Sequence, residues 1–390
     1  DVMSGTVQVD TVPPTSSIQI SGAVGDNGWY RSSVGVTISV TDTMSGPAPD
    51  EVYYRLDGGP WVKGNVVGIS ADGDHVLEHY GVDVAGNVGI PEESPVRIDT
   101  TAPGMPLDLT PSPATWINLN RFSISWTPPA DTSGIAGAYY KLDAEPLHNT
   151  DGTYVPNDTR IDDIAVSGEG KHSITVWLRD MAGNTNFLNR AARINAFLYD
   201  PLPPTTNASL SGTTGNNGWF TSPVTVTFVS QDQAGLSGVS DVAYRVDASA
   251  WVTETGVASA ATVIGASGKH VVEYRGLDAA GNLESVRALT VRVDTRPPAA
   301  PTDVRVTPAG WSRGSTFTVT WKNPVPADDS GIAAMYYKLN APPSGPTDGT
   351  RVAVVVPSAQ INVTTNGEHD LYVWLEDLAG NVGYQNYAWL

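Results

Sequence analysis

The five residues Asp83-Val84-Ala85-Gly86-Asn87 occur four times in this chain with small changes, at intervals of 97, 98 and 99 residues. The later copies are Asp180-Met181-Ala182-Gly183-Asn184, Asp278-Ala279-Ala280-Gly281-Asn282 and Asp377-Leu378-Ala379-Gly380-Asn381. Each copy follows a run that begins Gly-x-His and reads as a strand, so the motif is expected to be a hairpin turn. Glycine supplies the positive φ of such a turn, and the aspartate accepts its hydrogen bonds. A period of about 100 residues indicates four copies of one β domain.

The copies alternate between two types, in the order A-B-A-B. In type A, Asn27-Gly28-Trp29-Tyr30 recurs as Asn217-Gly218-Trp219-Phe220, and in type B, Phe122-Ser123-Ile124-Ser125-Trp126 recurs as Phe317-Thr318-Val319-Thr320-Trp321. Proline-rich junctions that begin with aspartate separate the copies, and proline makes such connectors stiff. We therefore expect an extended rod. The predicted domains are residues 10–99 (type A), 100–199 (type B), 200–294 (type A) and 295–390 (type B).

Each copy is predicted to hold about seven short strands and no helix. Short strands with turn signals about every 8–12 residues are typical of a two-sheet sandwich. The fold class is therefore all-β, with four tandem immunoglobulin-like β-sandwich domains. In the first copy the expected strands lie near residues 15–21, 34–41, 51–56, 60–63, 65–70, 75–82 and 94–99.

Two sets of motifs resemble known repeats. The strand that ends in Trp126-Thr127-Pro128-Pro129 and the bend Ser133-Gly134-Ile135 make type B similar to fibronectin type III domains. The Asp-x-Ala-Gly-Asn hairpin and the Asp-Thr-x-x-Pro junction make all four copies resemble bacterial immunoglobulin-like repeats of secreted and cell-surface proteins. The resemblance covers essentially the whole chain. It implies an extracellular or cell-surface location and a role as a stalk, adhesin shaft, surface-coat unit or spacer of a secreted enzyme.

The composition of the chain limits the classes of partner and of binding site that we expect. The net charge of −19 and the pI near 4.5 disfavour nucleic acid and anionic membrane surfaces, and favour cations. The chain contains no cysteine, so disulfides and thiolate metal sites are not available to it. No apolar run approaches the roughly 18 residues of a membrane helix, so we expect no membrane span.

Histidine would be needed for most hydrolytic chemistry, but here its placement indicates a structural role. His75, His172, His270 and His369 all stand at the same Gly-x-His strand start. A catalytic histidine is not expected to recur in four domains of two types. No Gly-x-Ser-x-Gly, His-Glu-x-x-His or phosphate-loop motif is present, so we expect that the chain is not an enzyme.

Tryptophan offers a second candidate function, because exposed indole rings stack on sugars. The alternating strands place four tryptophans in the predicted sandwich core: Trp126, Trp177, Trp321 and Trp374. Four more follow tight turns in type A and are expected to cover the edge of the core, with sugar binding as the alternative: Trp29, Trp61, Trp219 and Trp251.

Aspartate carries the sharpest prediction. In a sandwich of this topology, the start of the first strand, the loop after the second and the loop before the last strand meet at one pole, and each carries an aspartate. Three carboxylates there suit a hard cation, so we expect Ca²⁺ at the domain junctions. In the alternative, each aspartate only caps its own turn. The predicted ligands are Asp10, Asp42 and Asp83; Asp99, Asp131 and Asp180; Asp200, Asp232 and Asp278; and Asp294, Asp329 (or its neighbour Asp328) and Asp377.

The two ends of the chain resemble two parts of one domain. Residues 5–10 match the final strands at residues 94–99 and 289–294, so residues 1–9 are predicted to be the orphan final strand of a preceding or neighbouring domain. Only nine residues follow Asn381, whereas Asp200 comes 16 residues after Asn184. Copies of the chain are therefore expected to join head to tail through residues 1–9 and 295–390. One period cut from a longer covalent repeat would show the same pattern.

These observations favour a non-enzymatic extracellular structural protein, the repeat unit of a surface filament, sheath or adhesin shaft. The alternatives are a spacer or substrate-binding appendage of a secreted multidomain hydrolase, and a carbohydrate-binding module. Besides further copies of the chain, surface glycans or other cell-surface proteins are candidate partners.

Overall fold

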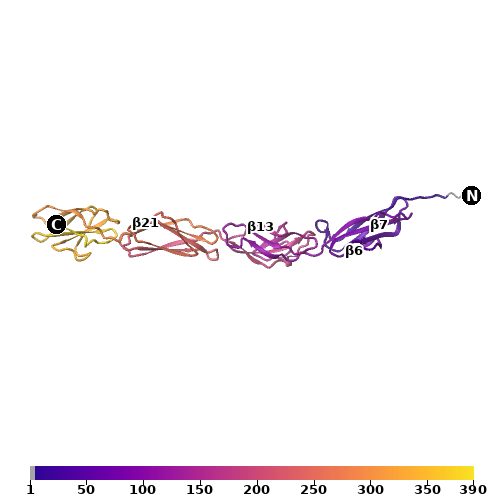
Figure 1. The fold of residues 1–390 in the computed structure, drawn as a ribbon, viewed down its shortest axis with the longest axis horizontal. Coiled ribbons are helices and arrows are strands. Elements are labelled where there is room, and N and C mark those ends of the chain that lie inside the picture. The colour runs from indigo at the N-terminus through magenta and orange to yellow at the C-terminus, as the bar shows by residue number, and fades with distance from the viewer. Residues whose placement is uncertain (1–4) are drawn as a thin grey trace. The chain divides into compact units, whose positions relative to one another are not determined.

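The computed structural model describes residues 5–390 and confirms the all-β fold of tandem sandwiches. The chain divides into two compact units, Asp1–Asp200 and Pro201–Leu390. Each unit holds one sandwich of type A followed by one of type B, and the colours of Figure 1 give the order of the sandwiches along the chain. Between the strands of the described residues there is one short 3-10 helix, η1 (Phe187–Asn189).

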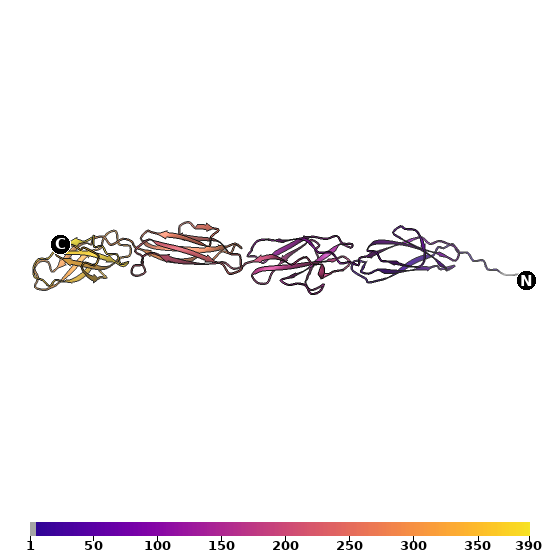
Figure 2. The ribbon, with the colours of Figure 1, turned by 90° about the horizontal axis from the view of Figure 1, so that it is seen from below.

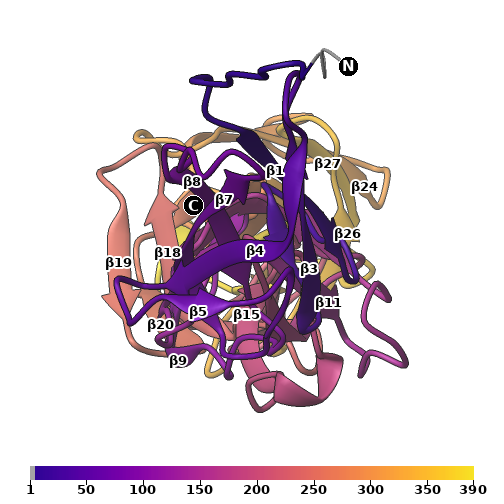
Figure 3. The same cartoon turned by 90° about the vertical axis from the view of Figure 1, so that its right-hand side faces the viewer.

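The first sandwich packs a three-stranded sheet against a five-stranded one (Figure 3). The smaller sheet has the order β1-β3-β6 and the larger one β2-β8-β7-β4-β5. All neighbours are antiparallel except β2 and β8, which run parallel. The bounds are β1 (Thr15–Ser21), β2 (Trp29–Tyr30), β3 (Val34–Thr41), β4 (Pro47–Leu56), β5 (Val62–Lys63), β6 (Val66–Ile69), β7 (Gly73–Asp83) and β8 (Glu92–Ile98).

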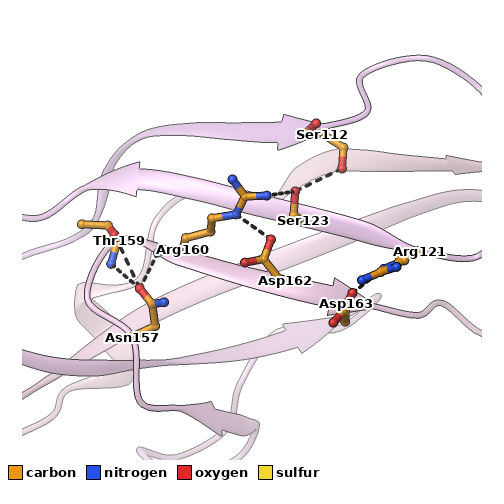
Figure 4. Close-up of polar contacts among 8 residues, drawn as sticks. All are labelled: Ser112, Arg121, Ser123, Asn157, Thr159, Arg160, Asp162 and Asp163. Atoms are coloured by element: carbon orange, nitrogen blue, oxygen red, sulfur yellow. Dashed lines mark hydrogen bonds and ion pairs between the residues drawn. The ribbon is translucent and has the colours of Figure 1, made fainter.

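The second sandwich repeats this arrangement without a separate strand in place of β2. Its sheets have the orders β13-β10-β9 and β12-β11-β14-β15. The bounds are β9 (Leu107–Ser112), β10 (Phe122–Thr127), β11 (Ile135–Leu142), β12 (Thr153–Val155), β13 (Arg160–Ile164), β14 (Gly170–Asp180) and β15 (Ile194–Tyr199). The outer face of β10 and β13 is polar: Arg160 pairs with Asp162 and Arg121 with Asp163 (Figure 4).

The second unit contains the third and fourth sandwiches (Figure 2). Their sheets have the orders β16-β17-β20 with β19-β18-β21-β22, and β23-β24-β27 with β26-β25-β28-β29. The third has the strands β16 (Thr205–Ser211), β17 (Val224–Gln231), β18 (Val239–Val246), β19 (Val252–Thr255), β20 (Ser259–Ile264), β21 (Gly268–Asp278) and β22 (Arg287–Val293). The fourth has β23 (Thr302–Thr307), β24 (Thr316–Lys322), β25 (Ile332–Leu339), β26 (Thr350–Ala353), β27 (Ser358–Asn362), β28 (Leu371–Asp377) and β29 (Ala388–Trp389).

Strand order identifies the kind of sandwich. In strand letters, every copy pairs A-B-E in one sheet and G-F-C-C′ in the other, as fibronectin type III and immunoglobulin-like domains do. The strands alternate inward apolar and outward polar residues, as in β3, where Val34, Val36 and Ile38 are buried and Thr37 and Ser39 are exposed. Each predicted domain encloses one hydrophobic cluster of its own, which burial of apolar surface stabilises.

Two of the four tryptophans that were predicted to lie in the sandwich core are found there. Trp126 and Trp321 lie between the sheets. Trp177 is also fully buried, but alternation along β14 turns it away from Val176 and Leu178, which face the core. It stacks on Tyr139, and its Nε1 donates to the carbonyl of Asn149, 2.8 Å away. Trp177 and its repeat Trp374, which stacks on Tyr336, are therefore buried on the outer face of the sheet, where a loop covers Trp177.

Residues 5–9, the described part of the predicted orphan final strand, form no strand within this chain. Residues 1–4 lie outside the described residues, and residues 5–9 pair with no strand of the described chain. Val7 is 90% exposed and Val9 is 73% exposed. The first sandwich already has its own final strand, β8, so its sheets offer this segment no edge at the corresponding position.

Candidate cation sites at the pole of each sandwich

Three of the four predicted aspartate sets lie wholly within one unit, and the structure brings each of these together. In every set the three residues have carboxylate oxygens that lie within 4.8 Å of one another. The remaining predicted set, Asp200, Asp232 and Asp278, is divided by the boundary between the units. Asp200 ends the first unit, and Asp232 and Asp278 belong to the second. The three complete sets are Asp10, Asp42 and Asp83; Asp99, Asp131 and Asp180; and Asp294, Asp328 and Asp377.

One predicted ligand needs correction. The sequence favoured Asp329 over its neighbour, but the structure places Asp328 beside Asp294 and Asp377. The Oδ1 atom of Asp328 accepts hydrogen bonds from the amides of Ser330 and Gly331, at 3.2 and 2.9 Å. These bonds hold Asp328 at the start of the bend and turn its carboxylate toward the pole, which leaves its neighbour outside the cluster.

The repeated hairpin places one carboxylate of each set. Asp180 ends β14, and its Oδ1 and Oδ2 accept from the backbone amide and the side-chain amide of Asn184, at 2.7 and 3.0 Å. The same Asn184 side chain also donates to the carbonyl of Asp99 at 2.9 Å. Gly183 has the predicted positive φ, 94°. The asparagine of the motif therefore ties the hairpin to the junction between the domains, a role that the turn pattern alone did not indicate.

The junction residue Asp99 contacts both sandwiches of the first unit. Its backbone amide donates to the carbonyl of Tyr30 in the first sandwich, 2.9 Å away. Its Oδ1 accepts from the amide of Thr101, and its Oδ2 from the amide of Ser133 in the second sandwich at 3.0 Å. Asp131 completes the set and accepts through Oδ1 from Gly134. Every carboxylate of the set thus also caps a turn.

Burial, with a smaller effect from neighbouring negative charges, raises the pKa of several of these carboxyls. Burial, with the neighbouring charges of Asp99 and Asp180, raises the pKa of the Asp131 carboxyl to about 6. In the fourth sandwich, burial together with Asp328 and Asp294 raises the pKa of Asp377 to about 6. In the more open first set, hydrogen bonds from Ser45 and Val12 instead hold the pKa of Asp10 below its usual value.

A docked loop adjoins the second set. The amide of Asp26 in the first sandwich donates to the carbonyl of Ala182 at 2.9 Å, and the side chain of Asn27 donates to the carbonyl of Met181 at 2.8 Å. A Cβ on Gly25 would meet the Ala182 oxygen at 2.4 Å, so this approach needs glycine. The second unit repeats the contact: Asn216 bonds to the carbonyl of Ala379, and Asn217 to that of Leu378.

The chemistry of the poles fits a hard divalent cation. Each complete set offers oxygen ligands from three aspartates, and Ca²⁺ takes six to eight oxygens from carboxylates, carbonyls and water. A bound cation would offset the burial and the like-charge repulsion that together raise the pKa of Asp131 and Asp377. The turn-capping bonds do not exclude a bound cation. Within the described residues, the hydrogen bonds to Asp131 and Asp328 all fall on Oδ1, so Oδ2 is left to coordinate an ion.

The recurrent histidines have the same two contacts in three sandwiches. In the first, His75 Nδ1 lies 2.8 Å from Asp57 Oδ2, and Nε2 lies 3.0 Å from the carbonyl of Ala71. The pairs His172–Asp143 and His270–Asp247 repeat this geometry. Each histidine therefore fastens one hairpin to the start of the next strand. Each aspartate partner follows a basic and an apolar residue, and this recurring triplet is the signal that could have revealed them in the sequence: Arg55-Leu56-Asp57, Lys141-Leu142-Asp143 and Arg245-Val246-Asp247.

The type A tryptophans are packed against their own domains. Trp29 and Trp219 are buried. Trp61 meets Tyr80 edge-on at 4.7 Å between ring centroids and has the guanidinium of Arg55 over its face at 4.8 Å. These contacts fit the expected cover at the core's edge.

Comparison with known proteins does not assign the chain to a family. No family model matches it. It is 28% identical to exoglucanase A of Cellulomonas fimi over 255 residues, which is 62% of this chain. The chain spans 28% of that relative's length.

Solved structures with similar parts are fibronectin type III-like. The three fibronectin domains FN1-FN3 of chicken CNTN1 align with 74% of this chain and 99% of theirs, at 14% identity and a TM-score of 0.27. The fibronectin(III)-like modules of CbhA from Clostridium thermocellum align with 48% of this chain and 94% of theirs, at 13% identity and a TM-score of 0.26. The strand order described above shows independently that the chain consists of such sandwiches. Among residues 5–390 there is no helix with the length and apolar character needed to cross a membrane.

Proposed function

We propose that this chain is a structural module of an extracellular or cell-surface protein, a shaft or spacer without catalytic activity, whose domain junctions are stiffened by Ca²⁺. The observation that carries the proposal is the junction at Asp99. One residue is bonded through its amide to the first sandwich and through its carboxylate to the second. The docked loop at Asp26 and Asn27 adds a second connection. Such a junction suits a module that holds its neighbours at a fixed separation.

Calcium enters the proposal through the acidic poles. The three aspartates of a pole converge only in the folded chain, so an ion held there stabilises the native state. At an ion concentration of about 100 times Kd the gain is about 2.7 kcal/mol per site. The second pole adjoins the docked loop through Ala182, so its occupancy is expected to reduce motion between the two sandwiches.

A distance measurement tests this stiffening. The chain has no cysteine, so Val66→Cys and Leu147→Cys, both at exposed positions, allow two labels on the first and second sandwiches. Calcium is expected to narrow the distribution of label distances, and a chelator to broaden it. The matched control carries Asp131→Asn in addition, and calcium is expected to narrow its distribution of label distances less than in the variant that keeps Asp131. Distributions that are equally broad with calcium and with chelator would refute the proposal.

A second candidate is favoured by the likeness to exoglucanase A. On that reading the chain is the spacer or substrate-binding appendage of a secreted multidomain hydrolase. Sedimentation of the chain with insoluble cellulose separates the two ideas: retention that is lost on replacing exposed tryptophans such as Trp311 favours the appendage. Recovery of the chain in the supernatant favours a shaft or spacer.

A further inference from the structure

The loop that docks on the second sandwich carries an Asn-Gly pair at its tip. Asn27 and Gly28 have positive φ values of 53° and 79°, and the amide of Trp29 donates to the carbonyl of Asp26 at 3.0 Å. These values fit a type I′ turn, whose two central residues both need positive φ and are often asparagine followed by glycine. Asn27 and Gly28 are both exposed. The pair therefore forms the turn and also reaches the next domain.

An Asn-Gly pair is able to modify itself. The backbone nitrogen of Gly28 attacks the side-chain carbon Cγ of Asn27, and glycine has no Cβ to obstruct the approach. A bond forms between this nitrogen and Cγ, and the bond from Cγ to Nδ2 breaks. The side-chain nitrogen leaves as ammonia and takes the proton of the Gly28 amide with it. Water then opens the five-membered imide at either of its two carbonyls and gives aspartate or isoaspartate, so a carboxylate replaces a neutral amide.

The structure leaves the attacking amide free and restrains the group that it attacks. Within residues 5–390 the amide of Gly28 donates no hydrogen bond, and a Cβ built on Gly28 would meet no atom within 4 Å. The side chain of Asn27, by contrast, donates through Nδ2 to the carbonyl of Met181 at 2.8 Å. This bond holds Cγ in one position, so the reaction is expected to proceed from the undocked loop.

We propose that Asn27 is a site of spontaneous deamidation, and that the reaction makes undocking of the loop irreversible. A carboxylate has no N–H group, so it and the carbonyl of Met181 would be two acceptors facing each other. The guanidinium of Arg179 adjoins the loop but already pairs with Asp26. Isoaspartate also adds one carbon atom to the main chain inside the turn, which displaces the bond between Asp26 and Trp29. The modified loop therefore does not dock again.

The second unit has the same arrangement. Asn217 and Gly218 have φ values of 53° and 75°, and Asn217 Nδ2 donates to the carbonyl of Leu378 at 2.8 Å. The amide of Gly218 donates no hydrogen bond in the described part of the chain. A further pair, Asn366-Gly367, is exposed in the fourth sandwich, and the Asn366 side chain has no hydrogen-bond partner among the described residues. Asn366 thus provides an internal reference for an unrestrained pair.

This inference goes beyond the structural role proposed above, and neither calcium nor a partner takes part in it. The full chain is incubated in chelator at pH 8, and peptide mass spectrometry follows the conversion of each amide to an acid. Asn27 is expected to react at least about tenfold more slowly than Asn366, the factor that one hydrogen bond provides. Gly25→Ala displaces the docked loop, so the rate at Asn27 is expected to rise by about tenfold, while the rates at Asn217 and Asn366 stay unchanged. Gly68→Ala is the matched control and is expected to change none of the rates.

Hydrogen exchange tests the product separately. The amide of Asp26 donates to the carbonyl of Ala182 at 2.9 Å when the loop is docked. In Asn27→Asp, which carries the carboxylate from the start, exchange of this amide is expected to be about tenfold faster than in the natural chain. The control Asn366→Asp is expected to leave it protected. The proposal is overturned by equal rates at Asn27 and Asn366 in the natural chain, by an unchanged rate at Asn27 in the Gly25 variant, or by protection of Asp26 that survives Asn27→Asp.

Discussion

Replacing Asp131 by asparagine is expected to stabilise the second sandwich in chelator and to weaken its response to calcium. The folded state raises the pKa of this carboxyl from 3.8 to about 6 through burial and the charges of Asp99 and Asp180. At about 1.4 kcal/mol per unit, ionising it costs the fold at most about 3 kcal/mol. Solvent screening at this half-buried position reduces the figure to about 1–2 kcal/mol. Asparagine keeps an oxygen for the amide of Gly134 and removes the charge.

Scanning calorimetry of the full chain measures the effect. At pH 7.5 in chelator, Asp131→Asn is expected to raise the melting temperature of one transition by about 4–16 °C, because a domain of this size shifts by about 4–8 °C per kcal/mol. With saturating calcium the variant is expected to gain less than the natural chain, because one ligand is weaker. The control Asp162→Asn removes an exposed charge paired with Arg160 at 2.5 Å and is expected to change stability by less than about 0.5 kcal/mol (Figure 4).

The pH dependence has a definite sign. A carboxyl whose folded pKa lies above its unfolded pKa favours folding at low pH, and this advantage is lost as the pH rises through the folded value. In chelator the second sandwich is therefore expected to lose stability between about pH 4 and about pH 6, and Asp131→Asn to remove much of that loss. A variant that melts below the natural chain in chelator would refute the electrostatic account of this pole.

Two further predictions concern other contacts. Gly25→Ala is expected to separate the docked loop from Ala182, because the new Cβ would lie 2.4 Å from the carbonyl oxygen of Ala182. The hydrogen bond from the Asp26 amide would then be lost, so hydrogen exchange at this amide is expected to accelerate by about tenfold, equivalent to about 1–2 kcal/mol. The hydrogen bond to Asp57 raises the pKa of His75, so its contribution to stability is complete below about pH 6.5 and is lost as the pH rises through the folded pKa. The urea midpoint of the His75→Gln variant is therefore expected to fall less than that of the natural chain as the pH rises through the folded pKa of His75.

Matched controls exist for both predictions. Gly68→Ala adds a Cβ into open space and is expected to leave the exchange of the loop unchanged. His148 lies in an exposed loop, so His148→Gln is expected to keep the pH dependence of the natural chain. Unchanged protection at Asp26 in the Gly25 variant, or an unchanged pH profile in the His75 variant, would contradict the respective contact.

Most of the fold could be predicted because the chain repeats its own pattern. Strands β1 and β3 have the predicted bounds, residues 15–21 and 34–41, since alternation is unambiguous where one face is buried. The acidic sets could be placed because topology alone brings three loops to one pole. The choice between Asp328 and Asp329 depended on which carboxylate reaches the amides of a bend, and that is a matter of local backbone geometry.

Contacts between distant surfaces could not be predicted in the same way. Alternation puts Trp177 on one face of β14, but it does not say that the loop with Asn149 folds over it. The docking of the loop at Asn27 on the hairpin at Met181 likewise joins segments more than 150 residues apart, and neither segment carries a pattern that names the other.

The double attachment of Asp99 has a mechanical consequence. Under tension along the chain, no flexible linker between the first two sandwiches can extend, because Asp99 is hydrogen-bonded to Tyr30 on one side and to Ser133 on the other. The force then acts on the end of β8, which is paired with β2 on one side and with β7 on the other. Several backbone hydrogen bonds are therefore loaded in shear at the same time and do not break one after another. The junction therefore transmits force into the sheets and does not act as a yielding hinge.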